Sequence, residues 1–155
     1  MNETAKRGFS LVEIMLVIGI MAVITTIIIF SFSTLNQNYA LEGAAQNAAA
    51  LFKDARGRTL SAKNNSQYGI HIASTSVTLF PGSVFDSGNP SNETLTFPQS
   101  VTIGTTTLSG VGFDIIFARL KGTPSQFGTT SVYLVNNPSK YINIFIRESG
   151  LVEIK

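Results

Sequence analysis

The residues best suited to chemistry lie near the N-terminus, where two cations, a glycine, an aromatic residue and a single carboxylate are closely spaced. Lys6 and Arg7 precede Gly8 and Phe9, and Glu13 follows. Glu13 is the only charged side chain in the long apolar run that it enters. An unpaired charge in apolar surroundings carries a heavy penalty. Glu13 therefore needs water or a positive partner, and ion pairing is the chemistry that this spacing indicates.

The rest of the chain offers little for catalysis. His71 is the only histidine, and we expect an exposed or partly satisfied strand residue there, because a catalytic base or a metal site needs partners. The absence of cysteine excludes disulfides, thiolate nucleophiles and cysteine-ligated metals. The G-x-S-x-G, S-x-x-K, P-loop and H-E-x-x-H patterns are also absent. We therefore expect no enzyme, no cofactor and no metal, and a membrane-anchored hydrolase is the disfavoured alternative.

Four oxygen-bearing side chains in one polar stretch raise the question of calcium, which prefers several oxygen ligands. They are Asp86, Asn89, Asn92 and Glu93. Because the group lacks a dense cluster of carboxylates, a solvated polar loop is the preferred interpretation.

Basic residues in the second half of the chain raise the question of whether the protein binds DNA. Arg119, Lys121 and Lys140 are the candidate contacts, with aromatic residues nearby in the sequence. From residue 61 onward, however, six basic residues stand against five acidic ones, whereas a phosphate-tracking groove concentrates positive charge. Cations at solvated strand edges are the preferred interpretation. If the three residues met in one exposed patch, DNA binding would be the favoured interpretation.

The elements that position these residues begin with an apolar segment. Only 13% of the 155 residues are charged, against roughly 25% in soluble domains, and the deficit is concentrated at the front. A bilayer core about 30 Å thick requires about 20 apolar helical residues, which residues 9–32 provide. Lys6 and Arg7 would keep the N-terminus in the cytoplasm and send the chain after residue 35 across the membrane.

Two simpler explanations of this segment compete. A secretory signal has an apolar region of about 7–15 residues and a small-x-small cleavage site, whereas this run is longer and has no such site. A plain single-span anchor fits the length but leaves Glu13 unexplained, although a shallow acidic residue costs less than a central one.

Beyond the apolar segment the sequence predicts more helix and then a β-rich head. An apolar stripe at helical spacing extends the helix to about Ala62, and stop signals follow in residues 63–69. The stripe consists of Leu41, Ala45, Ala48, Phe52 and Ala55. Alternating residues then predict strands within 68–73, 76–80, 94–97, 101–103, 113–119, 131–135, 141–147 and 151–154, the last two joined as a hairpin. The expected fold class is α+β, a long helix whose stripe packs on an antiparallel β-sheet head.

The run KRG-FSLVE, followed by about twenty apolar residues, resembles the class III signal of type IV pilins and type II secretion pseudopilins. The resemblance implies that a cytoplasm-facing prepilin peptidase cleaves between Gly8 and Phe9 and methylates the new amine of Phe9. It also implies that helices pack side by side in a filament, with Glu13 of one subunit beside the Phe9 amine of a neighbour. A helix that slipped in register would lose this partner.

The head resembles the H-type minor pseudopilins and FimT-like minor pilins through YGIHI, LFPG, FARLKG and INIFIRESGLVEI. The resemblance divides the chain into a leader (1–8), a transmembrane and assembly half of the helix (9–32), its amphipathic half (33–63) and the head (64–155). It implies a non-catalytic subunit of a type II secretion pseudopilus or type IV pilus.

Such a subunit would lie in the bacterial inner membrane with its head periplasmic or extracytoplasmic. Its partners would be prepilin peptidase, other pilins and membrane lipid. The alternative is a DNA-binding minor pilin of an uptake system. Many pilins have a proline where this chain has Phe30, which leaves open whether the helix melts there on assembly.

Overall fold

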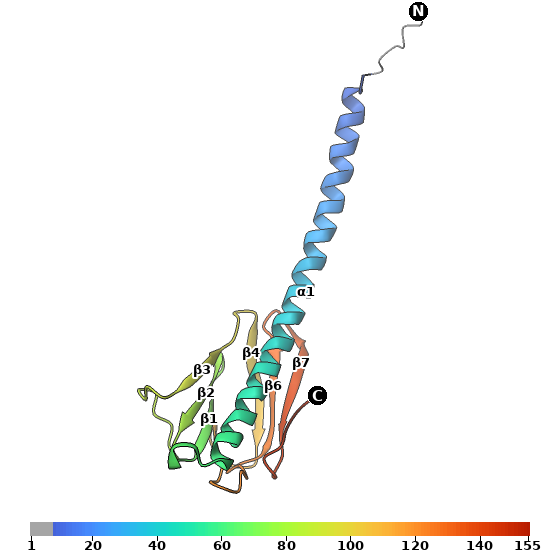
Figure 1. The fold of residues 1–155 in the computed structure, drawn as a ribbon. Coiled ribbons are helices and arrows are strands. Elements are labelled where there is room, and N and C mark those ends of the chain that lie inside the picture. Colours follow the sequence, from blue (N-terminus) through green and yellow to red (C-terminus); the bar gives the residue numbers. More distant parts are fainter. Residues whose placement is uncertain (1–7) are drawn as a thin grey trace, which may run out of the picture. The chain divides into compact units, whose positions relative to one another are not determined.

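The computed structural model describes residues 8–155, so Lys6 and Arg7 lie outside the described residues. This part of the chain contains one long helix followed by eight strands (Figure 1). The helix, α1, spans Leu11–Leu60. The chain divides into two compact units, residues 1–36 and residues 37–155, and α1 contributes to both.

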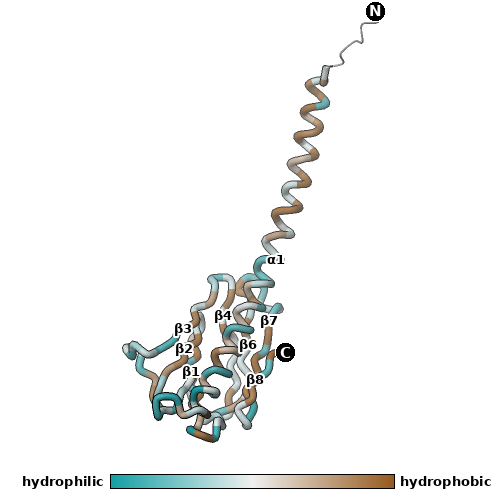
Figure 2. The backbone as a smooth tube through the Cα atoms, in the orientation of Figure 1, coloured by the Kyte–Doolittle hydropathy of each residue, from teal (hydrophilic) through white to brown (hydrophobic). Residues whose placement is uncertain are grey.

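In the first unit α1 is an apolar helix without a core. Its side chains from residue 11 to residue 29 are exposed, and Figure 2 shows that hydrophobic residues dominate this half of the helix. Thr25 and Thr26 donate their hydroxyl groups to the carbonyls of Met21 and Ala22, at 2.7 and 2.9 Å. These bonds satisfy both hydroxyls within the helix. Among the described residues, α1 is long and apolar enough to cross a membrane.

The second unit holds the head, whose strands form two antiparallel sheets. Sheet A has the order β3 (Glu93–Thr96), β2 (Ser76–Pro81), β1 (Tyr68–Ile72) and β5 (Asp114–Ile116). Sheet B has the order β4 (Val101–Leu108), β6 (Gly128–Leu134), β7 (Asn137–Ile146) and β8 (Val152–Ile154). The expected α+β fold, with one long helix on antiparallel strands, is confirmed.

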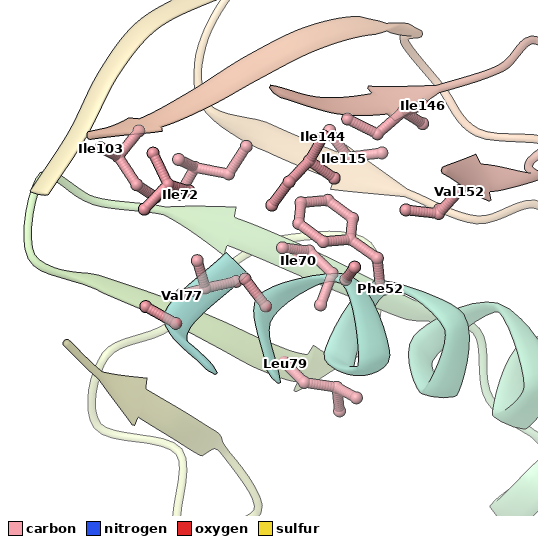
Figure 3. Packing of buried hydrophobic residues seen from close by; sticks show 14 of the residues in the cluster. Phe52, Ile70, Ile72, Val77, Leu79, Ile103, Ile115, Ile144, Ile146 and Val152 are labelled. Atoms are coloured by element: carbon pink, nitrogen blue, oxygen red, sulfur yellow. The ribbon is translucent and has the colours of Figure 1, made fainter. Parts of the chain in front are cut away.

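The core of the head lies where the second half of α1 meets the inner faces of both sheets. All five residues of the predicted helical stripe are buried, and Phe52 and three of the alanines are fully so. Figure 3 shows Phe52 of α1 packed among Ile70 and Ile115 of sheet A and Ile144 of sheet B. Spacing of apolar residues at the helical period therefore placed the buried face of α1 correctly.

The end of α1 is held to sheet A by a buried hydroxyl that the apolar pattern does not reveal. Thr59 is fully buried, donates to the carbonyl of Ala55 at 2.8 Å and accepts the backbone N–H of Tyr68 at 2.9 Å. The helix stops at Leu60, slightly before the predicted end, because Ala62 takes a left-handed φ of 47°. A short 3₁₀ turn, η1 (Lys63–Asn65), then leads into β1.

Strand boundaries differ from expectation where local backbone geometry overrides the apolar pattern. β4 continues through a threonine-rich stretch to Leu108, because threonine favours extended backbone. β5 is shorter than predicted, because Leu120 and Gly122 take left-handed φ values of 62° and 66° and form a tight turn. The predicted hairpin between β7 and β8 is confirmed, with Arg147 and Leu151 paired across it.

Candidate processing and assembly site

The start of α1 is an exposed, non-helical segment followed by an ordinary helix cap. Gly8, Phe9 and Ser10 are outside the helix and exposed. The carbonyl of Ser10 accepts the backbone N–H of Glu13 at 3.0 Å and of Ile14 at 3.2 Å. Ser10 therefore occupies the position that caps the helix, and the bond between Gly8 and Phe9 lies outside it.

Gly8 has no steric role within the described chain. A Cβ atom added at this position would meet no other heavy atom within 4 Å. Phe9, which follows it, is 78% exposed and packs on no core residue. Neither residue type is therefore dictated by folding.

Glu13 lies in the first turn of α1 and is exposed. A carboxylate in the first turn is favoured by the positive end of the helix dipole. The described residues provide no ion pair to Glu13. The large apolar side chains from Leu11 to Ile29 are also exposed. Glu13 is the only acidic residue in this part of α1, and the described residues give it no ionic partner.

His71 is a partly satisfied strand residue, as predicted. Its Nδ1 lies 2.6 Å from Oδ1 of Asp114, on the neighbouring strand of sheet A. Its ring stacks on Phe85, with ring centroids 3.9 Å apart and an angle of 4° between the planes. Phe85 also meets Phe80 edge-on at 5.4 Å. These contacts attach the loop after β2 to the outer face of sheet A.

The side-chain oxygens of Asp86, Asn89 and Glu93 accept hydrogen bonds within the protein, whereas Oδ1 of Asn92 is buried without a hydrogen-bond partner. Oδ1 of Asp86 accepts the N–H of Gly88 at 2.9 Å, and the amide of Asn92 donates to the carbonyl of Asp86 at 2.7 Å. Glu93 accepts two hydrogen bonds from Arg58. The described part of the chain contains no group of three or more histidine, cysteine, aspartate or glutamate residues arranged to hold a metal ion.

Arg58 forms ion pairs with Glu93 and Asp54, and these contacts shift the pKa values of Arg58 and Glu93. Hydrogen bonds from Arg58 lower the pKa of Glu93 below its usual range. Hydrogen bonds to Glu93 and then to Asp54 raise the pKa of Arg58 above its usual range. The arrangement is an electrostatic link between α1 and β3 and does not resemble an acid–base pair.

The three candidate DNA contacts do not form one patch. Lys140 donates to Oδ1 of Asn38 at 3.1 Å, near the start of the second unit. Arg119 bonds to Asn65, and the turn that contains Lys121 adjoins Leu60 at the end of α1. Asn38 and Leu60 are 22 residues apart in α1, about 33 Å at 1.5 Å per residue. The convergence that would favour DNA is therefore not observed.

Arg56 is a structural residue that the sequence pattern did not single out. Its Nε donates to the carbonyl of Gly122 at 3.2 Å, and its Nη2 donates to the carbonyl of Ser149 at 3.3 Å. It thereby joins α1 to the turn after β5 and to the hairpin between β7 and β8. These partners are far from Arg56 in the sequence, so only the fold could reveal them.

Two comparisons with known proteins gave matches, one to the sequence motif at the N-terminus and the other to the fold. Residues 4–29 match the sequence family described as the prokaryotic N-terminal methylation motif. No curated protein matches the chain. Among solved structures, the type IV minor pilin FimU of Pseudomonas aeruginosa is similar in two crystal forms. The first match has a TM-score of 0.54 at 14% identity and covers 74% of this chain and 92% of FimU. The second has a TM-score of 0.56 at 13% identity and covers 78% of this chain and 92% of FimU.

The minor pseudopilin EpsH from the type 2 secretion system of Vibrio cholerae gives a TM-score of 0.56 at 10% identity. The match covers 74% of this chain and 95% of EpsH. At such low identity the likeness is one of fold. The expected likeness of the head to the H-type branch is confirmed at that level. The chain thus combines a prokaryotic N-terminal methylation motif with the fold of type IV minor pilins and pseudopilins.

Proposed function

We propose that this chain is a non-catalytic pilin-like subunit, a minor pseudopilin or minor pilin of a type II secretion pseudopilus or type IV pilus. One observation carries the proposal. An exposed apolar helix with a methylation motif at its start continues into a head that has the fold of FimU and EpsH. The helix has no core of its own in residues 8–36, so it needs lipid before assembly and other helices afterwards.

The geometry at the start of α1 supports the proposed processing between Gly8 and Phe9. Residues 8–10 are exposed and non-helical, which suits the extended conformation in which a peptidase binds its substrate. Because folding places no demand on Gly8, a requirement for glycine there would come from prepilin peptidase. Cleavage would leave a cationic amine on Phe9, close to the first turn of the helix, and the same enzyme would methylate it.

Glu13 would pair with the Phe9 amine of an adjacent subunit. Before assembly the carboxylate is exposed and lies at the favourable end of the helix dipole. After assembly it would be enclosed by apolar side chains, where an unpaired charge is strongly unfavourable. The pair would therefore fix the register of neighbouring helices more than it would add net stability.

The proposed location is the bacterial inner membrane, crossed once, with a cytoplasmic N-terminus and an extracytoplasmic head. The length and hydropathy of α1 support membrane anchoring, and the cations before Gly8 support the orientation. Prepilin peptidase, membrane lipid and other pilins are the proposed partners. The three candidate DNA contacts do not converge, so the DNA-binding alternative is not proposed.

Intact-mass measurement of the full chain tests the proposal directly. The protein is extracted from a bacterial host with an active prepilin peptidase, and from the same host without the enzyme. We expect a species that begins at Phe9 and carries one additional methyl group in the first host, and the uncleaved chain in the second. A mature species with any other first residue would contradict the proposal.

A further inference from the structure

The face of sheet B that is turned away from α1 carries a groove of about 810 Å³. On β6, Val132 and Leu134 point into the core, so the alternate residues Ser131 and Tyr133 point to the opposite face. Ser131 and Tyr133 line the groove. Its volume is in the range of about 300–1,000 Å³ that is usual for ligand sites. We propose that this groove binds a neutral carbohydrate chain.

Two irregularities in strand pairing shape the groove. On one side, Ile103 pairs with Val132 and Thr106 with Thr130, so two residues of β4 oppose one residue of β6. On the other side, the pairing of β6 with β7 shifts after Tyr133, and the extra residues of β7 begin with Pro138. Bulges of this kind bend a strand and redirect its side chains. They border the groove on both sides of β6.

The floor of the groove is an aromatic surface that depends on a glycine. A Cβ atom at Gly104 would overlap the ring of Tyr133, so this ring lies directly against the backbone of Gly104. Tyr133 is also paired across strands with Tyr141. Tyr141 is 58% exposed although it lies on a strand next to a packed ring. Two adjacent tyrosines thus present apolar surface together with phenolic hydroxyls.

The remaining lining supplies hydrogen-bonding groups without charge. Ser131 Oγ donates to Oδ1 of Asn143 at 2.7 Å, which leaves the amide N–H groups of Asn143 as donors. Thr105 and Thr129 add hydroxyl groups. None of the described residues that line the groove is aspartate, glutamate, lysine, arginine or histidine. A charged ligand would find no counter-charge in this groove.

A neutral sugar chain matches this combination better than an extended peptide. A pyranose ring has an apolar C–H face that can lie on a tyrosine ring, and hydroxyl groups around its rim that bond to amides and hydroxyls. A peptide strand would be recognised chiefly through unpaired backbone groups at a sheet edge. β6, which carries Ser131 and Tyr133, is paired on both sides, with β4 and β7, so the floor of the groove offers no such edge.

Direct binding of neutral hexasaccharides to the purified full chain tests the proposal. The chain is held in an amphipol, because detergents with sugar head groups would compete for the groove. Maltohexaose, cellohexaose and chitohexaose are titrated by isothermal calorimetry. We expect saturable binding of at least one, roughly tenfold weaker in Tyr141→Ala, since loss of an aromatic anchor commonly costs this much.

Two further variants make the result specific to the groove. Tyr39→Ala removes an exposed tyrosine on α1 outside the groove and should leave affinity unchanged. Tyr141→Trp keeps an aromatic platform and should retain binding. The native chain has no tryptophan, so the fluorescence of this variant reports on position 141 alone. We expect this fluorescence to change as the sugar binds.

Absence of binding to all three sugars would overturn the proposal, as would equal affinity of the native chain and Tyr141→Ala. Stronger binding of an anionic oligosaccharide, tested with hexagalacturonate, would also overturn it. Circular dichroism of Tyr141→Ala checks that the exposed substitution leaves the fold intact. The assay requires neither cleavage nor assembly, so its outcome is independent of the proposed role as a pilin-like subunit.

Discussion

Arg58 on α1 and Glu93 on β3 are joined by two hydrogen bonds across 35 residues of sequence. Nη2 of Arg58 lies 2.8 Å from Oε2 of Glu93, and it also donates to Oδ2 of Asp54 at 2.6 Å. β3 is one of the two edge strands of sheet A, and none of its side chains is buried. The ion pair is therefore a main attachment of this edge strand to the helix.

Replacement of Glu93 by glutamine should lower the stability of the head in a pH-dependent way. The pKa of Glu93 is lower in the folded protein than in the unfolded chain, so its ionised form favours folding at neutral pH. We expect a loss of about 0.5–1 kcal/mol at pH 7, since the Glu93 side chain is half-exposed and solvent screens the pair. The loss should diminish as the pH falls through the lowered pKa, where the native carboxyl is also neutral.

Urea unfolding of residues 37–155, followed by circular dichroism from pH 7 to about pH 3, measures this difference. The fragment retains every buried residue of the described chain, from Leu41 to Val152. Glu148→Gln is the control, because Glu148 is exposed and forms no ion pair in the described structure. A stability difference between Glu93→Gln and the native fragment that stayed constant with pH would refute the ion-pair explanation.

Arg56→Ala should loosen two loops that are distant in sequence. It removes the donors to the carbonyls of Gly122 and Ser149, and we expect a loss of about 1–2 kcal/mol for the two bonds. Arg56→Lys should recover only part of this, because one ammonium group does not reproduce the planar fork of a guanidinium.

Hydrogen exchange of the head fragment measures the local effect of these Arg56 variants, and urea unfolding measures the global one. Lys53→Ala, an exposed change on the same helix, serves as the control. Unchanged exchange in the loops around Gly122 and Ser149 would show that Arg56 does not hold them.

Phe52→Ala should cause the largest loss of stability among single changes in α1. Phe52 is fully buried at the junction of the helix with both sheets, and truncation of a buried phenylalanine costs about 3–5 kcal/mol. Phe52→Leu should cost less because it fills more of the cavity. The midpoint of urea unfolding is the measurement, with Val135→Ala at a half-exposed position as the control. A cost below that of Val135→Ala would contradict the assigned core.

The sequence was sufficient for the parts of this fold that depend on repeated local patterns. The stripe from Leu41 to Ala55 and the strands β1 and β2 were predictable because the apolar residues that face the core recur at the helical or strand period. The pairing of strands into two sheets and the partners of Arg56 were not, since they depend on contacts between distant segments. The groove beside Tyr133 was equally hidden, because a bulge leaves no periodic signal.

The proposed assembly role of Glu13 predicts a defect that is separate from insertion. Glu13→Ala should enter the membrane normally, because removing a charge does not disfavour an apolar helix. It should fail to join filaments, because the Phe9 amine of its neighbour would then be enclosed without a partner. Membrane fractionation measures insertion, and the fraction of the subunit in sheared filaments measures assembly. Glu42→Ala, which removes an exposed carboxylate farther along α1, is the control, and equal incorporation of Glu13→Ala would refute the pairing.

A substitution at Gly8 should affect cleavage by the peptidase without affecting the stability of the folded protein. Since a Cβ at this position meets no other atom, Gly8→Val should leave the stability of the head unchanged. It should nevertheless block cleavage, because a branched side chain would clash with the proposed peptidase subsite, which we expect to be shaped around glycine. Intact mass reports cleavage, and urea unfolding of the full chain reports stability. Gly43→Ala, in α1 with equally open surroundings, should be cleaved as the native chain is. Normal cleavage of Gly8→Val would mean that recognition rests on residues other than this glycine.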